Sequence, residues 1–242
     1  KDLISDQSLF EEYCKTHSFE GKSNQVIAMP ASYSKNENLT YLVGLGDIKD
    51  SQDLYELGIN IGSKIKEDVE IDFLNTEINF VPIIDGILYA QYKFNDYKSK
   101  DESALNNIKF KKTDTVENEI KQSSIFWVRD QINTPALDKS PEDFIQNVNN
   151  LVDSSSIKVE VFDQKWLEEN NFGGVLGVAK GSDRAPYLVV GKYNEKAKYQ
   201  ISLIGKGVLF DSGGYSLKSP AGMETMKTDM SGAASAWGVI NL

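Results

Sequence analysis

Residues 205–214 read GKGVLFDSGG, Lys218 follows shortly after, and residues 226–230 read MKTDM. Within this stretch, Lys206, Asp211, Lys218 and Asp229 place two lysines and two aspartates on a glycine-rich frame at the end of an apolar run. Glycine lets the backbone turn tightly and approach a ligand closely. Carboxylates such as that of Asp211 are hard oxygen ligands for divalent metals. A nearby dication can also hold the amine of a lysine such as Lys206 neutral, so that it becomes a ligand too.

The spacing of these residues resembles the signature of the leucyl (cytosol) aminopeptidases, dinuclear metalloenzymes that remove N-terminal residues from peptides. The resemblance implies that Lys206, Asp211 and Asp229 are metal ligands, with Asp211 bridging the two ions. It implies that Lys218 polarises the peptide carbonyl and stabilises the developing oxyanion. Met226 would line the pocket for the departing side chain, so Lys218, Asp229 and Met226 form the substrate contacts. The ions would activate a hydroxide as nucleophile and anchor the free amine of the substrate.

The same resemblance implies the cofactors and partners of a complete enzyme. It implies two divalent ions per subunit, manganese or zinc, with bicarbonate in the complete enzyme; carboxylate ligands by themselves admit several metals. Peptides with a leucine-like N-terminal residue are the expected substrates, and a homo-hexamer is the expected assembly. The family completes its site with an Asn-Thr-Asp-Ala-Glu-Gly-Arg segment that does not occur in this sequence. We therefore expect the chain to lack the C-terminal part of the site and to be inactive alone.

Taken one at a time, the signature residues have ordinary structural interpretations. An aspartate at a Gly-Gly turn, such as Asp211, usually caps the turn, and Lys218 or Lys227 alone would be a solvated surface charge. Lys206 is less ordinary, because a lysine buried in an apolar stretch is rare unless it is paired or coordinated. Lys206 and Asp211 would point to opposite faces of an unbroken strand. Their convergence requires a bend, which the glycines flanking Lys206 permit.

Composition and charge restrict the classes of function. The 242 residues carry a formal net charge of −10, which argues against nucleic-acid binding because phosphate contacts need clustered lysine and arginine. A hydrophobic content of 40% is enough for a packed core. The single cysteine, Cys14, excludes an internal disulfide. No signal peptide or membrane-length apolar run is visible, so we expect a soluble, cytoplasmic protein.

Other catalytic chemistries find no support in the sequence. With His17 as its one histidine, the chain cannot build a histidine-based zinc site or a Cys/His nucleophilic pair. Ser212 lacks the Gly-x-Ser-x-Gly turn of serine hydrolases. Two alternatives remain open: a non-catalytic regulatory or DNA-binding relative that keeps the fold, and a metal-free ligand-binding α/β module. A long basic face would favour the first, and the joint presence of four signature residues counts against the second.

The hydrophobic pattern predicts an N-terminal α/β domain over residues 1–113, to which the resemblance assigns oligomer contacts and no catalytic residue. Apolar residues at helical spacing predict helices over 6–17, 50–66 and 82–94. Short apolar runs predict strands over 25–29, 40–43, 69–74 and 108–110. Polar residues accumulate over 98–114, where we place the domain boundary.

Residues 114–242 are predicted to form the N-terminal part of a catalytic metallopeptidase domain, cut short at Leu242. Helices are expected over 117–132, after Ser140, after Asp163 and beyond Asp229, and strands over 157–162, 187–190 and 200–204. Strands that alternate with helices predict an α/β fold in two domains. Each domain would be a mixed or mostly parallel sheet flanked by helices.

Overall fold

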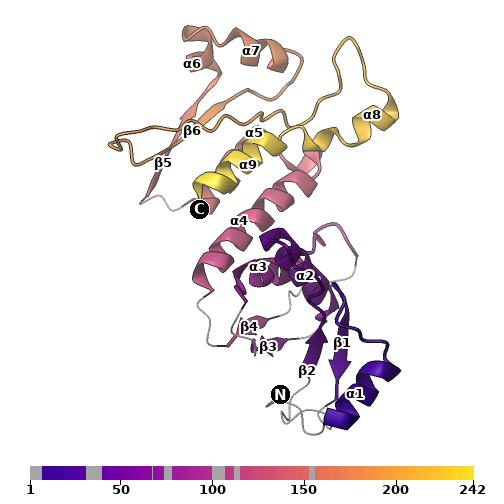
Figure 1. The fold of residues 1–242 in the computed structure, drawn as a ribbon. Helices are drawn as coiled ribbons and strands as arrows, with labels where there is room; N and C mark the ends of the chain where they lie inside the picture. Colours follow the sequence, from indigo (N-terminus) through magenta and orange to yellow (C-terminus); the bar gives the residue numbers. More distant parts are fainter. Residues whose placement is uncertain are drawn as a thin grey trace. The chain divides into compact units, whose positions relative to one another are not determined.

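The computed structural model describes residues 7–30, 40–66, 68–73, 78–99, 107–111, 115–152 and 156–242. The chain divides into two compact units, Lys1–Gln122 and Ser123–Leu242, and each contains helices and a small amount of sheet (Figure 1). The division falls inside helix α4, Val116–Asn133. The mixed α/β fold class is confirmed, whereas the domain boundary near Thr113 stays a prediction. Within the described ranges, every helix is too short or too polar to cross a lipid bilayer.

Unit 1 pairs its strands two by two. Its elements are α1 Gln7–Thr16, β1 Val26–Met29, β2 Thr40–Val43, α2 Ser51–Lys64, β3 Val69–Ile71, α3 Val81–Tyr89, β4 Ile108–Phe110 and the first part of α4. Strands β1 and β2 are antiparallel, with Val26 opposite Val43. Strands β3 and β4 are parallel, with Val69 opposite Ile108. Helix α3 ends at Tyr89 and is therefore shorter than the helix predicted over 82–94.

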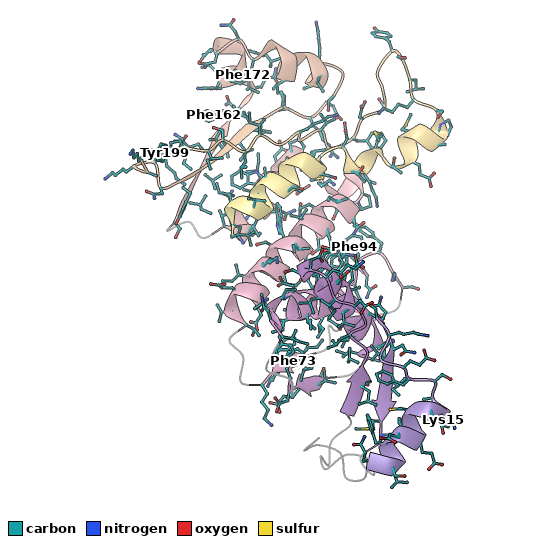
Figure 2. All side chains as sticks on the ribbon, in the orientation of Figure 1. Lys15, Phe73, Phe94, Phe162, Phe172 and Tyr199 are labelled. Atoms are coloured by element: carbon teal, nitrogen blue, oxygen red, sulfur yellow. The ribbon has the colours of Figure 1, made fainter. Side chains whose placement is uncertain are left out.

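Helices α2 and α3 approach each other so closely that glycine is required on both. A Cβ on Gly58 would lie 2.2 Å from the carbonyl oxygen of Ile83, and one on Gly86 would lie 2.1 Å from that of Tyr55. Phe73, which is labelled in Figure 2, stacks on Phe80 with ring centroids 4.2 Å apart. The buried members of this core are Leu54, Leu57, Ile65, Ile83 and Ile87. Burial of this apolar surface is the main stabilising contribution to unit 1.

Unit 2 continues from α4 with short helices around one antiparallel strand pair. Its further elements are η2 Ala136–Asp138, α5 Pro141–Leu151, β5 Ile157–Phe162, α6 Gln164–Glu169, α7 Gly173–Ala179, β6 Leu188–Tyr193, α8 Pro220–Glu224, η3 Met226–Thr228 and α9 Ser231–Ile240. Strand β5 pairs with β6, with Ile157 opposite Tyr193. Ser140 caps α5 as predicted, accepting a hydrogen bond from the backbone N–H of Asp143.

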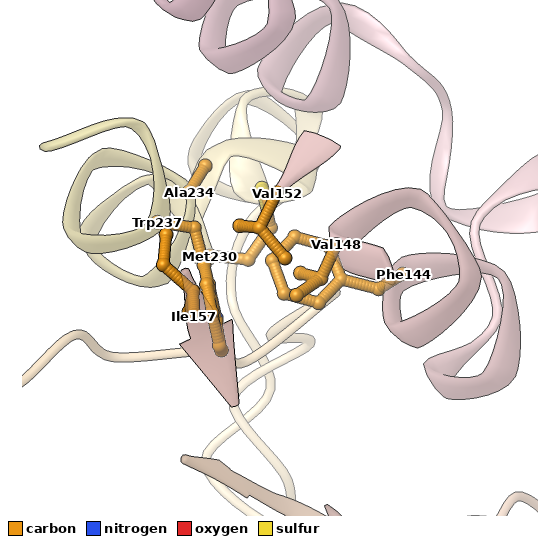
Figure 3. Packing of buried hydrophobic residues seen from close by; sticks show 7 residues of the cluster. All are labelled: Phe144, Val148, Val152, Ile157, Met230, Ala234 and Trp237. Atoms are coloured by element: carbon orange, nitrogen blue, oxygen red, sulfur yellow. The ribbon is translucent and has the colours of Figure 1, made fainter. Parts of the chain in front are cut away.

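The core of unit 2 joins α5, β5 and α9. Its buried members are Phe144, Val148, Val152, Ile157, Met230, Ala234 and Trp237 (Figure 3). Met230 and Ala234 are 0% exposed. Because Met230 directly follows Asp229 in the sequence, packing of this core fixes the start of α9 beside the signature.

Two predictions for unit 2 are wrong in detail. The strand expected over 200–204 does not form within the described residues: no neighbouring strand pairs with it, and Ile201 and Ile204 are 87% and 95% exposed. A strand is stable only when its backbone groups are paired. The helix after Asp163 is expected from the sequence to end near Phe172 and Gly173; it ends at Glu169, and a separate helix, α7, follows it.

Candidate functional site

The backbone at Lys206 lies directly on the first turn of α9. The carbonyl oxygen of Lys206 accepts a hydrogen bond from the backbone N–H of Ala233 at 2.9 Å. A Cβ on Gly205 would lie 2.5 Å from the Cα of Ala233, and one on Gly232 would lie 3.0 Å from the backbone nitrogen of Lys206. The small residues on both segments therefore allow the signature lysine to reach the start of α9, where Asp229 lies.

The Asp-Ser-Gly-Gly turn holds Asp211 in place. Gly213 has φ +92°, and a Cβ on it would lie 2.4 Å from the carbonyl oxygen of Ser216, so this position requires glycine. Its backbone N–H donates a hydrogen bond to Oδ1 of Asp211 at 2.8 Å. The backbone N–H of Lys218 donates to the carbonyl oxygen of Ser212 at 3.0 Å, which closes the loop that carries both charges.

Two lysine–aspartate pairs form in this part of unit 2. The Nζ of Lys206 donates a hydrogen bond to Oδ1 of Asp229 at 2.8 Å, and the Nζ of Lys218 lies 3.1 Å from Oδ2 of Asp211. The side chain of Lys206 is 59% exposed, so the expectation that it is buried is wrong. The reason is that the stretch around Lys206 does not join a sheet that would cover it.

Asp229 has an oxygen that suits a metal ligand. Its side chain is only 19% exposed, and although the Nζ of Lys206 lies 2.7 Å from Oδ2, the hydrogen bond goes to Oδ1. Oδ2 is buried and accepts no hydrogen bond from the described part of the chain. The charge of the Lys206 ammonium offsets the cost of burying this oxygen. A carboxylate is also a hard oxygen ligand for divalent metals, so Asp229 fits a metal ion that would take the place of this ammonium.

Hydrogen bonding and charge keep Asp211 ionised. The hydrogen bond from the backbone N–H of Gly213 lowers the pKa of the Asp211 carboxyl below its ordinary value, and the ammonium of Lys218 lowers it further. The charge of Lys206 adds a smaller lowering of the pKa. Because a carboxylate must be deprotonated to bind a metal, Asp211 is ready to act as a ligand.

Met226 lies against the other signature lysine. The Nζ of Lys218 is 3.0 Å from Sδ of Met226. The backbone N–H of Asp229 donates to the carbonyl oxygen of Met226 at 3.3 Å, so one short turn carries both residues. Of the predicted site residues, the structure thus pairs Lys206 with Asp229 and brings Lys218 to both Asp211 and Met226.

The described residues do not form a complete metal cage by themselves. They contain no group of three or more His, Cys, Asp or Glu side chains able to hold a metal ion. A site built here therefore needs the amine of Lys206 besides the two carboxylates, or ligands from further residues.

One buried residue beside this site, Lys139, was not predicted from the sequence. It is 1% exposed and donates hydrogen bonds to backbone carbonyls. Predicting the burial of Lys139 from the sequence would require knowing that the end of α4 lies next to η3.

Comparisons with known proteins agree with this geometry. The profile described as "Cytosol aminopeptidase family, catalytic domain" matches residues 126–242. The chain is 31% identical over 245 aligned positions to probable cytosol aminopeptidase 1 of Shewanella oneidensis, an alignment covering 93% of this chain and 48% of that protein. It is 35% identical over 187 positions to a probable cytosol aminopeptidase of Clostridium perfringens, covering 71% and 38%. The chain belongs to the leucyl (cytosol) aminopeptidase family.

Solved structures support the family fold. A cytosol aminopeptidase from Coxiella burnetii superposes with a TM-score of 0.80 at 28% identity, over 98% of this chain and 51% of that one. The bottromycin maturation enzyme BotP, in complex with Mn, gives a TM-score of 0.78 at 21% identity, over 95% and 52%, and shows a shared fold. The chain spans about half the length of the cytosol aminopeptidases that it matches.

Proposed function

We propose that the whole protein containing this chain is a metal-dependent aminopeptidase that removes the N-terminal residue of peptides. The observation that carries the proposal is the joint arrangement of Lys206, Asp211, Lys218 and Asp229 around one turn, with the largely buried carboxylate of Asp229 paired to Lys206. Membership of the cytosol aminopeptidase family supports the same activity.

Lys206, Asp211 and Asp229 would hold the metal. Two divalent ions bound there would supply Lewis-acid activation of a water molecule and an anchor for the free amine of the substrate. Asp211 would contribute an ionised carboxylate that two cations can share, and Asp229 would contribute a carboxylate that is only 19% exposed. The manganese in the related BotP structure supports manganese as the first metal to test, with zinc as the second. Bicarbonate in the complete enzyme is a further part of this proposal.

Lys218 would act on the substrate. Its side chain is 30% exposed, so the ammonium is held by Asp211 and Met226 yet remains reachable from solvent. A cation fixed in this way can polarise the scissile carbonyl and stabilise the oxyanion that develops on it. Met226, in contact with Lys218, would line the pocket for a leucine-like side chain, since methionine adapts to apolar groups of different shape.

The resemblance further supports a homo-hexamer in the cytoplasm, and the relatives are named as cytosol enzymes. A net charge of −10 argues against the alternative of a DNA-binding relative. Light scattering of the whole protein tests the assembly, and a monomer would contradict it.

Turnover of leucine-p-nitroanilide by the whole protein tests the activity. We expect hydrolysis that needs added Mn²⁺ and stops when a chelator removes it. Hydrolysis that persists in chelator after exhaustive dialysis would contradict the proposal. The isolated chain of residues 1–242 serves as a second sample, and we expect it to show no turnover, because the family's remaining ligands and arginine do not occur in it.

A further inference from the structure

A buried lysine, Lys139, follows η2 and reaches the end of helix α4 with its ammonium. The side chain of Lys139 is 1% exposed, and its ammonium donates hydrogen bonds to the carbonyl oxygens of Gln131, Thr134 (3.2 Å) and Lys227 (3.4 Å). An ammonium has three donors, so these three carbonyls satisfy it. The carbonyls that end a helix also favour a positive charge. These contacts offset the cost of burying the charge.

A second lysine makes the reverse connection. The Nζ of Lys227 donates a hydrogen bond to the carbonyl oxygen of Asn133, the last residue of α4, at 2.7 Å. The carbonyl oxygen of Lys227 meanwhile accepts from Lys139. Lys227 therefore donates directly to the end of α4, and the ammonium of Lys139 bridges that end to η3 by donating to carbonyl oxygens of both. Neither lysine contacts a carboxylate through these bonds.

The turn that these lysines hold carries two signature residues. Met226 begins η3 and lies against Lys218, and Asp229 follows η3 and pairs with Lys206. A short 3₁₀ segment has few internal hydrogen bonds of its own. Its position relative to the two signature lysines therefore depends on contacts from outside, and Lys139 and Lys227 supply such contacts.

We propose that Lys139 and Lys227 are positioning residues that clamp the 226–229 turn to the end of α4 and so set the position of Asp229 and Met226. The effect on metal binding and turnover rests on the proposed function. The clamp itself rests on the hydrogen bonds alone. Residues that orient metal ligands typically change metal affinity when they are replaced.

Lys139→Met in the whole protein tests the clamp, since methionine keeps the length and apolar stem of lysine but removes its donors. We expect faster hydrogen exchange confined to the 226–232 segment and a metal affinity, titrated with Mn²⁺ alone, that is weaker by roughly tenfold. A residue that only stabilised the fold would speed exchange across α5 and β5 as well and would leave the affinity of the folded protein unchanged. Lys165→Met is the matched control, because the side chain of Lys165 is 81% exposed on α6.

Lys227→Met tests the clamp from the other side and decides the matter if Lys139→Met does not fold. It removes the donation to Asn133 and leaves Lys139 in place, so we expect the same local exchange and a smaller loss of metal affinity. Unchanged exchange at 226–232 in Lys227→Met overturns the clamp. If the wild-type protein neither binds Mn²⁺ nor cleaves peptides, the proposed function fails, and the exchange measurement still decides the clamp.

Discussion

The two units satisfy their buried charges in different ways. In unit 1 the buried carboxylate of Asp85 accepts a hydrogen bond from Nδ2 of Asn118 at 2.8 Å and forms an ion pair with Lys121. In unit 2 the ammonium of Lys139 is surrounded by carbonyl oxygens, and the carboxylate of Asp229 forms an ion pair with Lys206, whose side chain is 59% exposed. Among the described residues, Asp85 has an amide donor besides its lysine, whereas the carboxylate of Asp229 has Lys206 alone. A metal ion could take the place of that one ammonium, so the pair in unit 2 is the one suited to a ligand, whereas the pair in unit 1 serves stability.

The units also differ in how they cover apolar residues. The core of unit 1 is closed by its own helices and strands, with Leu57 and Ile87 at 2% and 0% exposure. Unit 2 leaves a run of large apolar side chains uncovered just before the signature, and its exposed members are Tyr199, Ile201, Leu203 and Ile204. Tyr199 stands out from the unit in Figure 2. Contiguous exposed apolar residues usually mark a surface that another part of a protein covers.

The largest effect is expected from Asp211→Asn in the whole protein. The change removes the negative charge that two cations would share, so metal binding and peptide hydrolysis should both be lost. Elemental analysis beside a leucine-p-nitroanilide assay measures the two together. A variant that keeps its metal content and its turnover would remove Asp211 from the proposed site.

Lys218→Ala should separate chemistry from metal binding. We expect a loss of turnover of roughly 100- to 1000-fold, the usual effect of deleting an oxyanion donor, with the metal content unchanged. Elemental analysis and kcat measured on the same preparation check this. Loss of the metal would instead assign Lys218 to the ligand set.

In unit 1, Lys121→Met should affect stability alone. Asp85 would keep Asn118 but lose its ion pair, and a buried group that loses a partner typically costs about 1–3 kcal/mol. Denaturant unfolding measures this loss, and metal content and kcat should stay at the wild-type level. A change in metal content would show that the contrast between the units is too simple.

Much of the fold follows from local sequence signals. The cap at Ser140 and the apolar periodicity that predicts α2 and α5 are properties of neighbouring residues, and these elements appear where they are expected. The strand predicted over 200–204 fails for a different reason. Its apolar residues have strand character, but a strand also needs a neighbouring strand to pair its backbone, and sequence propensity carries no information on that neighbour.

The candidate site divides in the same way. The spacing of Lys206, Asp211, Lys218 and Asp229 is visible in the sequence because these residues lie close together along the chain. The sequence does not show which of these residues pair with each other. Lys218 lies against Asp211 and Met226, and Lys206 lies against Asp229. These contacts depend on the turn at Gly213 and on the packing of Met230. Lys139 is further removed, since its contact with Lys227 spans 88 residues of sequence.

The charge of Lys139 should make stability depend on pH in unit 2. Burial, with a smaller effect from the charge of Lys227, lowers the pKa of Lys139 from 10.5 to about 8. Between these two pH values the unfolded chain holds a proton that the folded chain has released, so raising the pH through this window should increase the free energy of unfolding. Lys139→Met should lack this contribution. Denaturant unfolding of both proteins at pH 7.5 and 9.5 measures it, and a wild-type advantage that shrinks with rising pH would contradict the assignment.

The smallest effect is expected at the uncovered apolar run. In the isolated chain the side chain of Ile204 is 95% exposed, so Ile204→Ser should change the free energy of unfolding by no more than about 0.5 kcal/mol. Leu209→Ser is the matched control, because Leu209 packs against the core of unit 2 and its loss should cost about 1–3 kcal/mol. In the whole protein we expect Ile204→Ser to cost as much as the control, since further residues would cover the run. If Ile204→Ser changes the free energy of unfolding negligibly in both the isolated chain and the whole protein, the apolar run stays exposed in both. Unit 2 would then leave more apolar surface exposed than unit 1 in the whole protein as well.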